Sequence, residues 1–502
     1  MAGPYVSRFD AGVQIAIFPL FGCFSAAWGI GATESEFGRL SYLKRHAADF
    51  TLLVAAGCFA GLGYYVYLYV FSSDDLFSLS GAAVGVFWGA ALLFVAAVVL
   101  FRRETRQSMA LICCSCGVSI YLIEAALQVY SLMRAPLPWE VGRGGMITVV
   151  AKLRKQGLEA YTGTFALDLD PDLQGLKPLA QLSNTWTVDC QEAGPPLAYK
   201  TDEHGFHNPP GLWAHPKWQV VALGDSFTQG FCVPSDSNMV ALIRRVYPLT
   251  LNLATAGDSP LEEFAKLREF VAPYKPRHVL WFFYEGNDLR DMMRRKDFNV
   301  FKAYLKSDSF TQQLLSRQRE VDEILRDRVL RAWHDLPQYQ RLLSKEEPLS
   351  EEELEKLADD ELSQRVTQNA RYRLNMFAKF TEIRHHLGLL GLRQKDAPDD
   401  AYRLLERILE KSKALIESWD GTLTFVYVTG VESYNGTARE TSRKRVFALV
   451  ERLGLPIVNI DDAFLAHGNP TSLFAWGKYG GHFNSEGYRV ASEEILYYLS
   501  AR

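Results

Sequence analysis

Ser226 has the surroundings of a catalytic nucleophile. It follows the apolar run 218–223, which predicts a buried strand ending at Gly224, and it precedes a predicted helix. Open α/β folds bind their ligands at the carboxyl ends of the strands. The N-terminus of the next helix offers free N–H groups and the positive end of its dipole there, which favours a developing oxyanion. An ordinary strand–helix connection with a capping serine would fit the same residues.

His482 is the predicted partner of Ser226. A serine hydroxyl is a weak nucleophile until a nearby imidazole accepts its proton. His482 lies between Gly481 and Phe483, 256 residues after Ser226, so only folding could bring the two together. We predict that Ser226 is an acyl-accepting nucleophile and that His482 is its general base. In the alternative interpretation, His482 only caps the helix predicted after it.

Two further motifs also stand at the ends of predicted strands. Asn-Leu-Ala-Thr-Ala-Gly-Asp-Ser occupies 252–259, and Phe-Tyr-Glu-Gly-Asn-Asp occupies 283–288. With Gly-Asp-Ser at 224–226 and Gly-His-Phe-Asn-Ser-Glu-Gly-Tyr at 481–488, the chain presents serine, glycine, asparagine and histidine in that order. This order resembles the SGNH (GDSL-type) hydrolase family over about 200–500, apart from a helical insertion. The stretch 199–208 is similar to the lead-in of bacterial membrane-anchored members.

The resemblance implies both a fold and an oxyanion hole. The implied fold is α/β, a three-layer α/β/α SGNH-hydrolase-like domain around a flavodoxin-like parallel sheet. The implied oxyanion donors are the backbone N–H groups of Ser226 and Gly257 and the side-chain amide of Asn287. Loss of one such donor typically lowers turnover by about 100–1,000-fold. The resemblance calls for no cofactor and no metal.

The third member of the expected triad departs from the family. An aspartate usually stands three residues before the histidine, but Tyr479 occupies that position here. Asp461 or Asp462, at the end of the last predicted strand, could orient His482 instead. A backbone carbonyl could also do so, which would give a Ser-His dyad, and an inactive site is the third alternative. Loss of the orienting group alone need not abolish activity, because the oxyanion donors still contribute.

The fold is also predicted from the residues alone. Apolar runs at 218–223, 249–253, 278–284, 422–428 and 456–460 indicate buried parallel strands, and helical segments alternate with them. We therefore predict an α/β domain over 201–502, with a charged helical insertion at 290–420. The insertion could be a lid, a partner surface or a solvated helical cap. Residues 134–200 form a linker and lead-in, with short extra strands expected at 149–153 and around Trp186.

Two groups of residues in the lead-in and the loops after it could form a metal site or a disulfide. Asp202, His204 and His207 lie close together on a loop rich in glycine and proline, without a fourth ligand, so a structural loop is favoured over a metal site. Cys190 and Cys232 are the two cysteines outside the apolar first third. They could form a disulfide if this domain faces an oxidising compartment.

Residues 1–133 are predicted to be a transmembrane region of about four helices. The spans are 12–30, which is the weakest, 51–71, 81–101 and 109–130, since roughly 20 apolar residues cross a bilayer. The loops with Lys44 and Arg45 and with Arg102 and Arg103 are basic, which places them in the cytoplasm and everything after 133 outside. Glu124 lies near the outer end of the last span, where an interfacial or helix-packing role is favoured.

The composition and the predicted membrane topology limit the classes of function that fit this chain. A net charge of −4 and a pI of about 6.2 give no indication of nucleic-acid binding. A bacterial inner-membrane protein with a periplasmic catalytic domain could be an esterase or O-acyl(acetyl)transferase acting on cell-envelope or exported polysaccharide. It could instead be a lipase or lysophospholipase, or a non-catalytic subunit of a membrane complex. The expected partners are the lipid bilayer, a glycan or lipid ester substrate and, for a transferase, a separate membrane protein that delivers acyl groups.

Overall fold

The structure is a computed structural model that divides into two compact units. It describes residues 46, 48–57, 60, 80–132, 145–163, 176–190, 192, 194–215, 217–334, 340, 342, 349–378, 380–386, 396–434, 440–477 and 480–501. One unit comprises Met1–Ser131 with Arg373–Ile383, and the other comprises Leu132–Tyr372 with Arg384–Arg502. The candidate functional residues all belong to the second unit.

A parallel five-stranded sheet forms the centre of the second unit. Its strands are β4 (Val220–Leu223), β5 (Thr250–Asn252), β6 (His278–Tyr284), β7 (Thr422–Val428) and β8 (Ile457–Asn459). They lie in the order β5-β4-β6-β7-β8, and every pair is parallel. This is the flavodoxin-like order, and all five predicted strands are confirmed. Their apolar runs are continuous because both faces of the sheet are covered.

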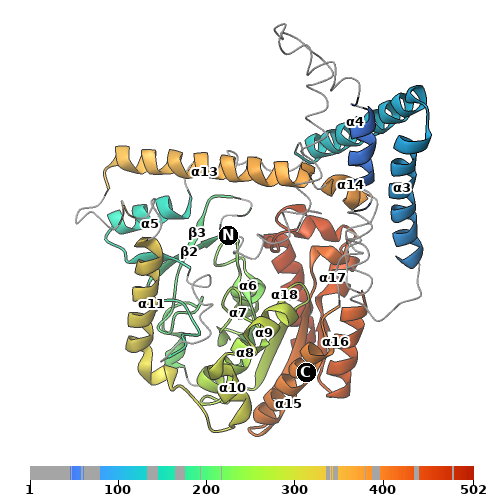
Figure 1. The fold of residues 1–502 in the computed structure, drawn as a ribbon. Helices are drawn as coiled ribbons and strands as arrows, with labels where there is room; N and C mark the ends of the chain where they lie inside the picture. Colours follow the sequence, from blue (N-terminus) through green and yellow to red (C-terminus); the bar gives the residue numbers. More distant parts are fainter. Residues whose placement is uncertain are drawn as a thin grey trace. The chain divides into compact units, whose positions relative to one another are not determined.

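Alternate residues of the strands pack on opposite faces of this sheet. Val220 and Ala222 join the core beneath α7 (Met239–Arg244), α17 (Ile460–Ala466) and α18 (Ser485–Ser500). Val221 and Leu223 join the core of the other face, which includes buried residues of four longer helices and the short π-helical turn Leu267–Val271. Those helices are α8 (Pro260–Lys266), α9 (Asp288–Arg295), α15 (Asp399–Glu417) and α16 (Glu440–Arg452) (Figure 1). The predicted three-layer α/β/α class is confirmed.

The lead-in forms a second, smaller sheet. Its strands are β1 (Ala160–Thr162), β2 (Trp186–Cys190) and β3 (Leu197–Lys200), in the order β1-β2-β3. The strand expected around Trp186 is confirmed, but the one expected at 149–153 is wrong, because these residues lie within helix α5 (Met146–Lys155). Glu361 of α13 (Glu351–Ala378) accepts hydrogen bonds from the N–H groups of Gly145, Ile147 and Thr148. This remote carboxylate satisfies the first free donors of α5 and so stabilises a helix in a β-branched stretch.

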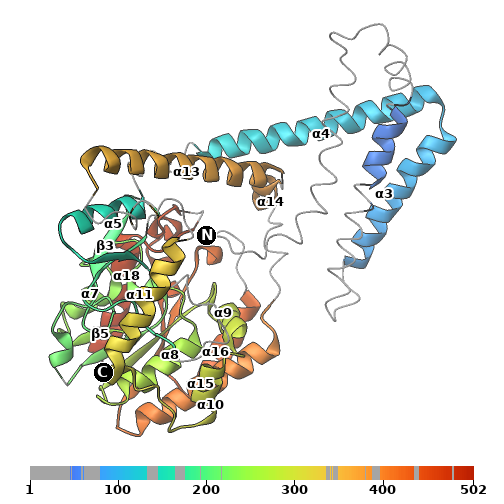
Figure 2. The ribbon, with the colours of Figure 1, turned by 60° about the vertical axis from the view of Figure 1, so that its left-hand side comes forward.

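The helices of the predicted insertion contact the lead-in. α11 (Gln318–His334) buries Val321, Leu325, Val329 and Trp333 along one face. The Trp333 indole N–H donates to Thr162 at the end of β1, at 3.2 Å. In Figures 1 and 2, α13 lies beside α5 and α11 runs below it. The predicted stretch 290–420 also contains α10 (Asn299–Lys306), α14 (Thr381–His386) and α15, and α15 packs in the core of the main sheet. Through these contacts, α11 and α13 support the lead-in. The role of the insertion as a lid stays a prediction.

The first unit contains one described helix that could cross a membrane. Residues Arg103–Tyr130 of α4 (Arg103–Leu132) are long and apolar enough, and only 11% of the apolar window is buried. They include the predicted span 109–130. The predicted span 81–101 corresponds to α3 (Ser80–Leu100), whose segment Trp88–Leu100 is apolar. Of the other two predicted spans, 12–30 and most of 51–71 lie outside the described residues.

Glu124 has a packing role inside the first unit. Its side chain is fully buried and accepts hydrogen bonds from the backbone N–H groups of Glu382 and Ile383, at 3.1 and 2.9 Å. These two residues belong to the first turn of α14. A carboxylate at a helix N-terminus satisfies free donors and complements the helix dipole. The favoured helix-packing interpretation of Glu124 agrees with these contacts.

Candidate active site

Ser226 begins the short helix α6 (Ser226–Gln229), directly after β4. The turn requires Gly224, because a Cβ there would lie 2.3 Å from Thr228 Oγ1 and 2.9 Å from Phe282 Cβ. Asp225 caps the helix by accepting a hydrogen bond from the Phe227 N–H at 3.0 Å. Burial raises the pKa of Asp225 to about 6, although the Phe227 N–H opposes that rise. Asp225, rather than Ser226, therefore provides the side-chain cap of this helix.

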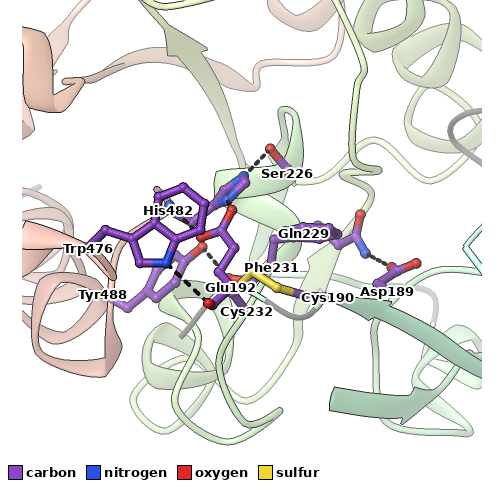
Figure 3. Close-up of a disulfide and its surroundings, with 10 residues drawn as sticks. All are labelled: Asp189, Cys190, Glu192, Ser226, Gln229, Phe231, Cys232, Trp476, His482 and Tyr488. Carbon is purple, nitrogen blue, oxygen red and sulfur yellow. Dashed lines mark hydrogen bonds and ion pairs between the residues drawn. A yellow bond between two sulfur atoms is a disulfide. The ribbon is translucent and has the colours of Figure 1, made fainter. Parts of the chain in front are cut away.

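The hydroxyl of Ser226 lies within hydrogen-bonding distance of His482. The distance from His482 Nε2 to Ser226 Oγ is 2.8 Å (Figure 3). The loop that carries His482 is closed by an isolated bridge between Phe474 and Phe483. Gly481, with φ of +84°, allows the sharp change of direction just before the histidine. Folding thus brings together the two predicted reacting groups, and the geometry is that of a nucleophile with its general base.

Glu192 is the group that orients His482. Its Oε1 lies 2.7 Å from His482 Nδ1, and its Oε2 accepts a hydrogen bond from the His482 backbone N–H at 2.9 Å. Because Nδ1 faces a carboxylate, it carries the proton, and the lone pair of Nε2 is left facing the serine. Burial raises the pKa of Glu192, but the hydrogen bonds and charge of His482 outweigh it and hold the pKa below the ordinary value. Glu192 is therefore ionised at neutral pH.

Asp461 and Asp462 do not take this role, so both predictions for the orienting group are wrong. Asp461 accepts hydrogen bonds from Arg443 Nη1 at 2.6 Å and from the Tyr434 hydroxyl at 2.5 Å. Asp462 is exposed on α17. Within the described residues, no hydrogen bond joins either aspartate to His482. A carboxylate already paired with a guanidinium loses that partner if it turns toward an imidazole.

The sequence carried one signal that could have identified Glu192. Cys190 and Cys232 form a disulfide with a Cα–Cα distance of 5.2 Å, so the possible pairing is confirmed. Cys232 follows the nucleophile helix by only three residues, and Glu192 follows Cys190 by two. The disulfide therefore tethers a carboxylate to the loop beside Ser226. The Trp476 indole N–H holds the same segment by donating to the Glu192 carbonyl at 3.1 Å (Figure 3).

The three predicted oxyanion donors lie at the ends of neighbouring strands. Ser226 follows β4, Gly257 lies in the turn after β5, and Asn287 lies between β6 and α9. Because β4 stands between β5 and β6, the other two segments flank Ser226. Gly257 has φ of +83°, and its carbonyl accepts a hydrogen bond from Arg295 at 2.7 Å. The turn is also held by Gln229 of the nucleophile helix, which accepts from the Ala256 N–H.

Asn287 is not used as a helix cap. It precedes α9, yet its side chain makes no capping hydrogen bond, and its Oδ1 atom is buried without a hydrogen-bond partner in the described structure. The neighbouring Asp288 instead accepts from the Tyr284 N–H at 2.8 Å. The Asn287 side chain interacts with the Asp225 carboxyl group, which lies next to Ser226. Donation by its amide to an oxyanion stays a prediction.

The group Asp202, His204 and His207 is structural, as favoured. Asp202 is fully buried and accepts hydrogen bonds from the N–H groups of His204 and Phe206, both at 2.9 Å. His207 contacts the Gln229 carbonyl through Nδ1 at 3.0 Å and Ser235 through Nε2 at 2.9 Å. Burial lowers the pKa of His207 to about 4. These hydrogen bonds join the lead-in loop to the segment that follows the nucleophile.

Comparison with known proteins gives likenesses to solved hydrolases. No protein-family model matches the sequence. No curated protein matches it either. A putative lipolytic protein of the G-D-S-L family from Desulfitobacterium hafniense DCB-2 is 10% identical, with a TM-score of 0.28, over 56% of this chain and 98% of that chain. The lipase/acylhydrolase from Enterococcus faecalis is 13% identical, with a TM-score of 0.29, over 57% and 96%.

A third likeness is to LAE5, an alpha/beta hydrolase enzyme from the metagenome of Lake Arreo, Spain. It is 14% identical, with a TM-score of 0.29, over 58% of this chain and 96% of that chain. The chain resembles the G-D-S-L hydrolases. The function proposed below rests on this chain's own residues.

Proposed function

We propose that the chain is a membrane-anchored serine esterase in which Ser226, His482 and Glu192 form the catalytic triad. The observation that carries this proposal is the pair of contacts at one imidazole, 2.8 Å to the Ser226 hydroxyl and 2.7 Å to the Glu192 carboxylate. A histidine that only capped a helix would need neither contact. A non-catalytic subunit is expected to have a misaligned pair, and these distances weigh against that alternative.

The reaction follows from these positions. Ser226 Oγ attacks the ester carbonyl carbon and gives its proton to His482 Nε2, while the Glu192 carboxylate stabilises the imidazolium that forms. The N–H groups of Ser226 and Gly257 and the amide of Asn287 bind the oxyanion of the tetrahedral intermediate. The intermediate expels the alcohol, which takes the proton from His482. Water then attacks the acyl-serine by the same route and restores the enzyme.

The disulfide supports an extracytoplasmic location. Cys190 and Cys232 lie in the part of the chain that the basic loops place outside the membrane. Disulfides persist in the periplasm and are rare in a reducing cytoplasm. Two independent arguments, loop charge and cysteine pairing, thus favour a periplasmic catalytic domain anchored in the bacterial inner membrane. Cytoplasmic acyl-CoA would not reach such a site, so hydrolysis is favoured over transfer unless a separate membrane protein delivers acyl groups.

Trp476 favours a glycan ester over a lipid ester. Its indole N–H is fixed by the Glu192 carbonyl, and the residue is 42% exposed beside His482 (Figure 3). A fixed and exposed indole offers a flat face on which a sugar ring can pack. We therefore propose O-acyl groups of cell-envelope or exported polysaccharide as the substrate class, with lipase or lysophospholipase activity as the second candidate.

The test compares full-length protein in detergent with its Ser226→Ala variant. We expect wild-type protein to hydrolyse p-nitrophenyl acetate and to be labelled by a fluorophosphonate probe. The variant should lose about 10³-fold or more in turnover and should not be labelled. Equal turnover by the two proteins, without labelling, would remove the esterase proposal. Faster turnover of a long-chain p-nitrophenyl ester than of the acetate would favour the lipase candidate.

A further inference from the structure

Glu192, Cys232 and His482 form a cluster with the composition of a zinc site. One ligand-type atom from each residue lies within 4.8 Å of the other two. The ligand atoms around a tetrahedral zinc, bound at about 2.0–2.3 Å, lie roughly 3.5 Å apart. Glu192 Oε1 and His482 Nδ1, which are 2.7 Å apart, would separate slightly, and the Cys232 sulfur, within 4.8 Å of both residues, would adjust its position. While the disulfide is intact, however, the Cys232 sulfur is bonded to Cys190 and provides no thiolate.

We propose that reduction of the Cys190–Cys232 disulfide opens a Zn²⁺ site formed by Cys232, Glu192 and His482, and that zinc bound there shuts off the active site. Thiolate, imidazole and carboxylate are the ligands that zinc takes in proteins, and three protein ligands leave the fourth position to water. Because Glu192 and His482 also belong to the proposed triad, the inhibition by zinc rests on the esterase function proposed above, whereas the binding of zinc does not.

Cys232 is the member of the disulfide that is placed to move. Cys190 is buried at the end of β2, whereas Cys232 is partly exposed on the loop after α6. Cys232 also has φ of +69°, in the left-handed region that residues with a Cβ seldom occupy. Breaking the covalent link lets this loop relax and lets the sulfur turn away from Cys190. Glu192 and His482 already lie beside it, partly buried.

The chemistry balances with a dithiol as the reductant. The dithiol donates two electrons and two protons, becomes a cyclic disulfide itself, and leaves two protein thiols. Zinc then displaces the proton of the Cys232 thiol, and a Zn–S bond forms. On His482, Nε2 faces Ser226 and Nδ1 faces Glu192, so zinc enters at Nδ1. The proton formerly on Nδ1 moves to Nε2, which can then no longer accept the serine proton.

Electrostatics favour a cation at this position. Both oxygens of Glu192 face His482, one 2.7 Å from Nδ1 and the other 2.9 Å from the backbone nitrogen. A divalent cation would replace the positive charge that the imidazolium brings during turnover, and it would remain after the proton has left.

The experiment compares Cys190→Ser with the double variant Cys190→Ser/Cys232→Ser in full-length protein. Both lack the disulfide and keep the other cysteines, so they differ only in the Cys232 thiol. Co²⁺ is titrated first, because a cobalt–thiolate bond gives a charge-transfer band in the near ultraviolet. Zn²⁺ then displaces it. We expect the single variant to gain a band that the double variant lacks and to bind zinc roughly 10–100-fold more tightly.

A second arm uses the wild-type protein as it exists. It is reduced with a phosphine, which is removed before metal is added, and it is compared with unreduced protein. Reduced protein should bind one more Zn²⁺ and lose p-nitrophenyl acetate turnover beyond the fall that reduction alone causes, and a chelator should reverse only this further loss. Oxidised protein should neither bind the additional Zn²⁺ nor lose turnover when Zn²⁺ is added. Equal metal binding by the two variants, or by the two redox states, would overturn the proposal. Metal binding is read without turnover, so a failure of the esterase function would not be mistaken for a failure of the site.

Discussion

Two carboxylates, Glu192 and Asp461, can be compared because each could have oriented His482. Asp461 lies just after β8, near the carboxyl edge of the main sheet, where sequence reasoning places an active site. Glu192 lies on an irregular segment between β2 and β3 of the small sheet. Asp461 is paired with Arg443 at 2.6 Å, whereas Glu192 directs both oxygens at His482.

The difference shows that a position at the sheet edge is not sufficient for a carboxylate to contact His482. Arg443 also contacts Glu285 and Tyr427, so Asp461 belongs to a separate polar network at the ends of β6 and β7. Withdrawing one partner from a partly buried charged network leaves other charges uncompensated. Glu192 has no such competing cation among the described contacts, and a disulfide holds its segment in place. The carboxylate on this tethered loop therefore orients His482.

The sharpest test of this comparison exchanges the two carboxylates for amides. Glu192→Gln keeps the size of the side chain but cannot stabilise the imidazolium, so kcat should fall about 10³–10⁴-fold while KM changes little. Asp461→Asn is the matched control, and its kcat should stay close to wild type even if stability decreases. Kinetics with p-nitrophenyl acetate measure both. A larger loss of kcat in Asp461→Asn than in Glu192→Gln would reverse the assignment.

Substitution of Asn287 measures how much a side chain at the sheet edge contributes to turnover. Asn287→Ala removes one predicted oxyanion donor, and we expect kcat to fall about 100–1,000-fold with a small change in KM. Asn238→Ala serves as the control, because Asn238 caps α7 by accepting from the Ala241 N–H at 2.8 Å. That variant should lose stability but keep its kcat. Wild-type kcat in Asn287→Ala would exclude it from the oxyanion hole.

The tether of Glu192 is tested by removing the disulfide. In Cys190→Ala/Cys232→Ala, Glu192 keeps its hydrogen bonds but loses its covalent anchor, so we expect kcat to fall by roughly tenfold, less than for Glu192→Gln. The bond joins cysteines 42 positions apart. Closing a loop of this length stabilises a fold by about 4 kcal/mol in the chain-entropy model. Denaturant unfolding gives the stability, and a kcat equal to that of wild type would show that the tether is dispensable for orientation.

The smallest effect on turnover is expected at His207, which links the lead-in to the nucleophile segment. Its folded pKa of about 4 lies below the ordinary value of 6.5, because the buried imidazole stays neutral. As the pH falls, the His207 imidazole therefore binds a proton in the unfolded chain at a higher pH than in the folded protein. The stability that the neutral ring contributes is complete above pH 6.5 and is lost between pH 6.5 and 4, by about 3 kcal/mol.

The variant His207→Gln isolates this contribution. The difference in unfolding free energy between wild type and His207→Gln should decrease by that amount from pH 7 to pH 4, while kcat at pH 7 stays near wild type. Asp189, whose pKa burial raises to about 6, has the opposite sign, because its carboxyl group holds a proton in the fold that the unfolded chain has already lost. Asp189 is present in both wild type and His207→Gln, so its contribution cancels when their unfolding free energies are subtracted. A difference independent of pH would contradict the burial of a neutral ring.

Sequence patterns were sufficient to predict the sheet and to pair Ser226 with His482, whose side chains lie 2.8 Å apart. The strands at 218–223, 278–284 and 422–428 could be predicted because a buried parallel strand must be apolar over its whole length, which is a local property. Ser226 and His482 could be predicted because each stands in a local motif at the edge of an element. The helix α5 could not, since Glu361, more than 200 residues away, satisfies its first N–H groups.

Only the tertiary structure decided which carboxylate faces His482. Nothing in the residues next to Glu192 indicates its contact with His482, because that contact depends on a disulfide and on a histidine 290 residues later in the chain. Nothing next to Asp461 shows that it pairs with a guanidinium, because Arg443 reaches it from another helix. Local periodicity fixes where strands and helices form. The partner that a charged side chain finds depends on which distant segments converge on it, and that is set by packing of the whole unit.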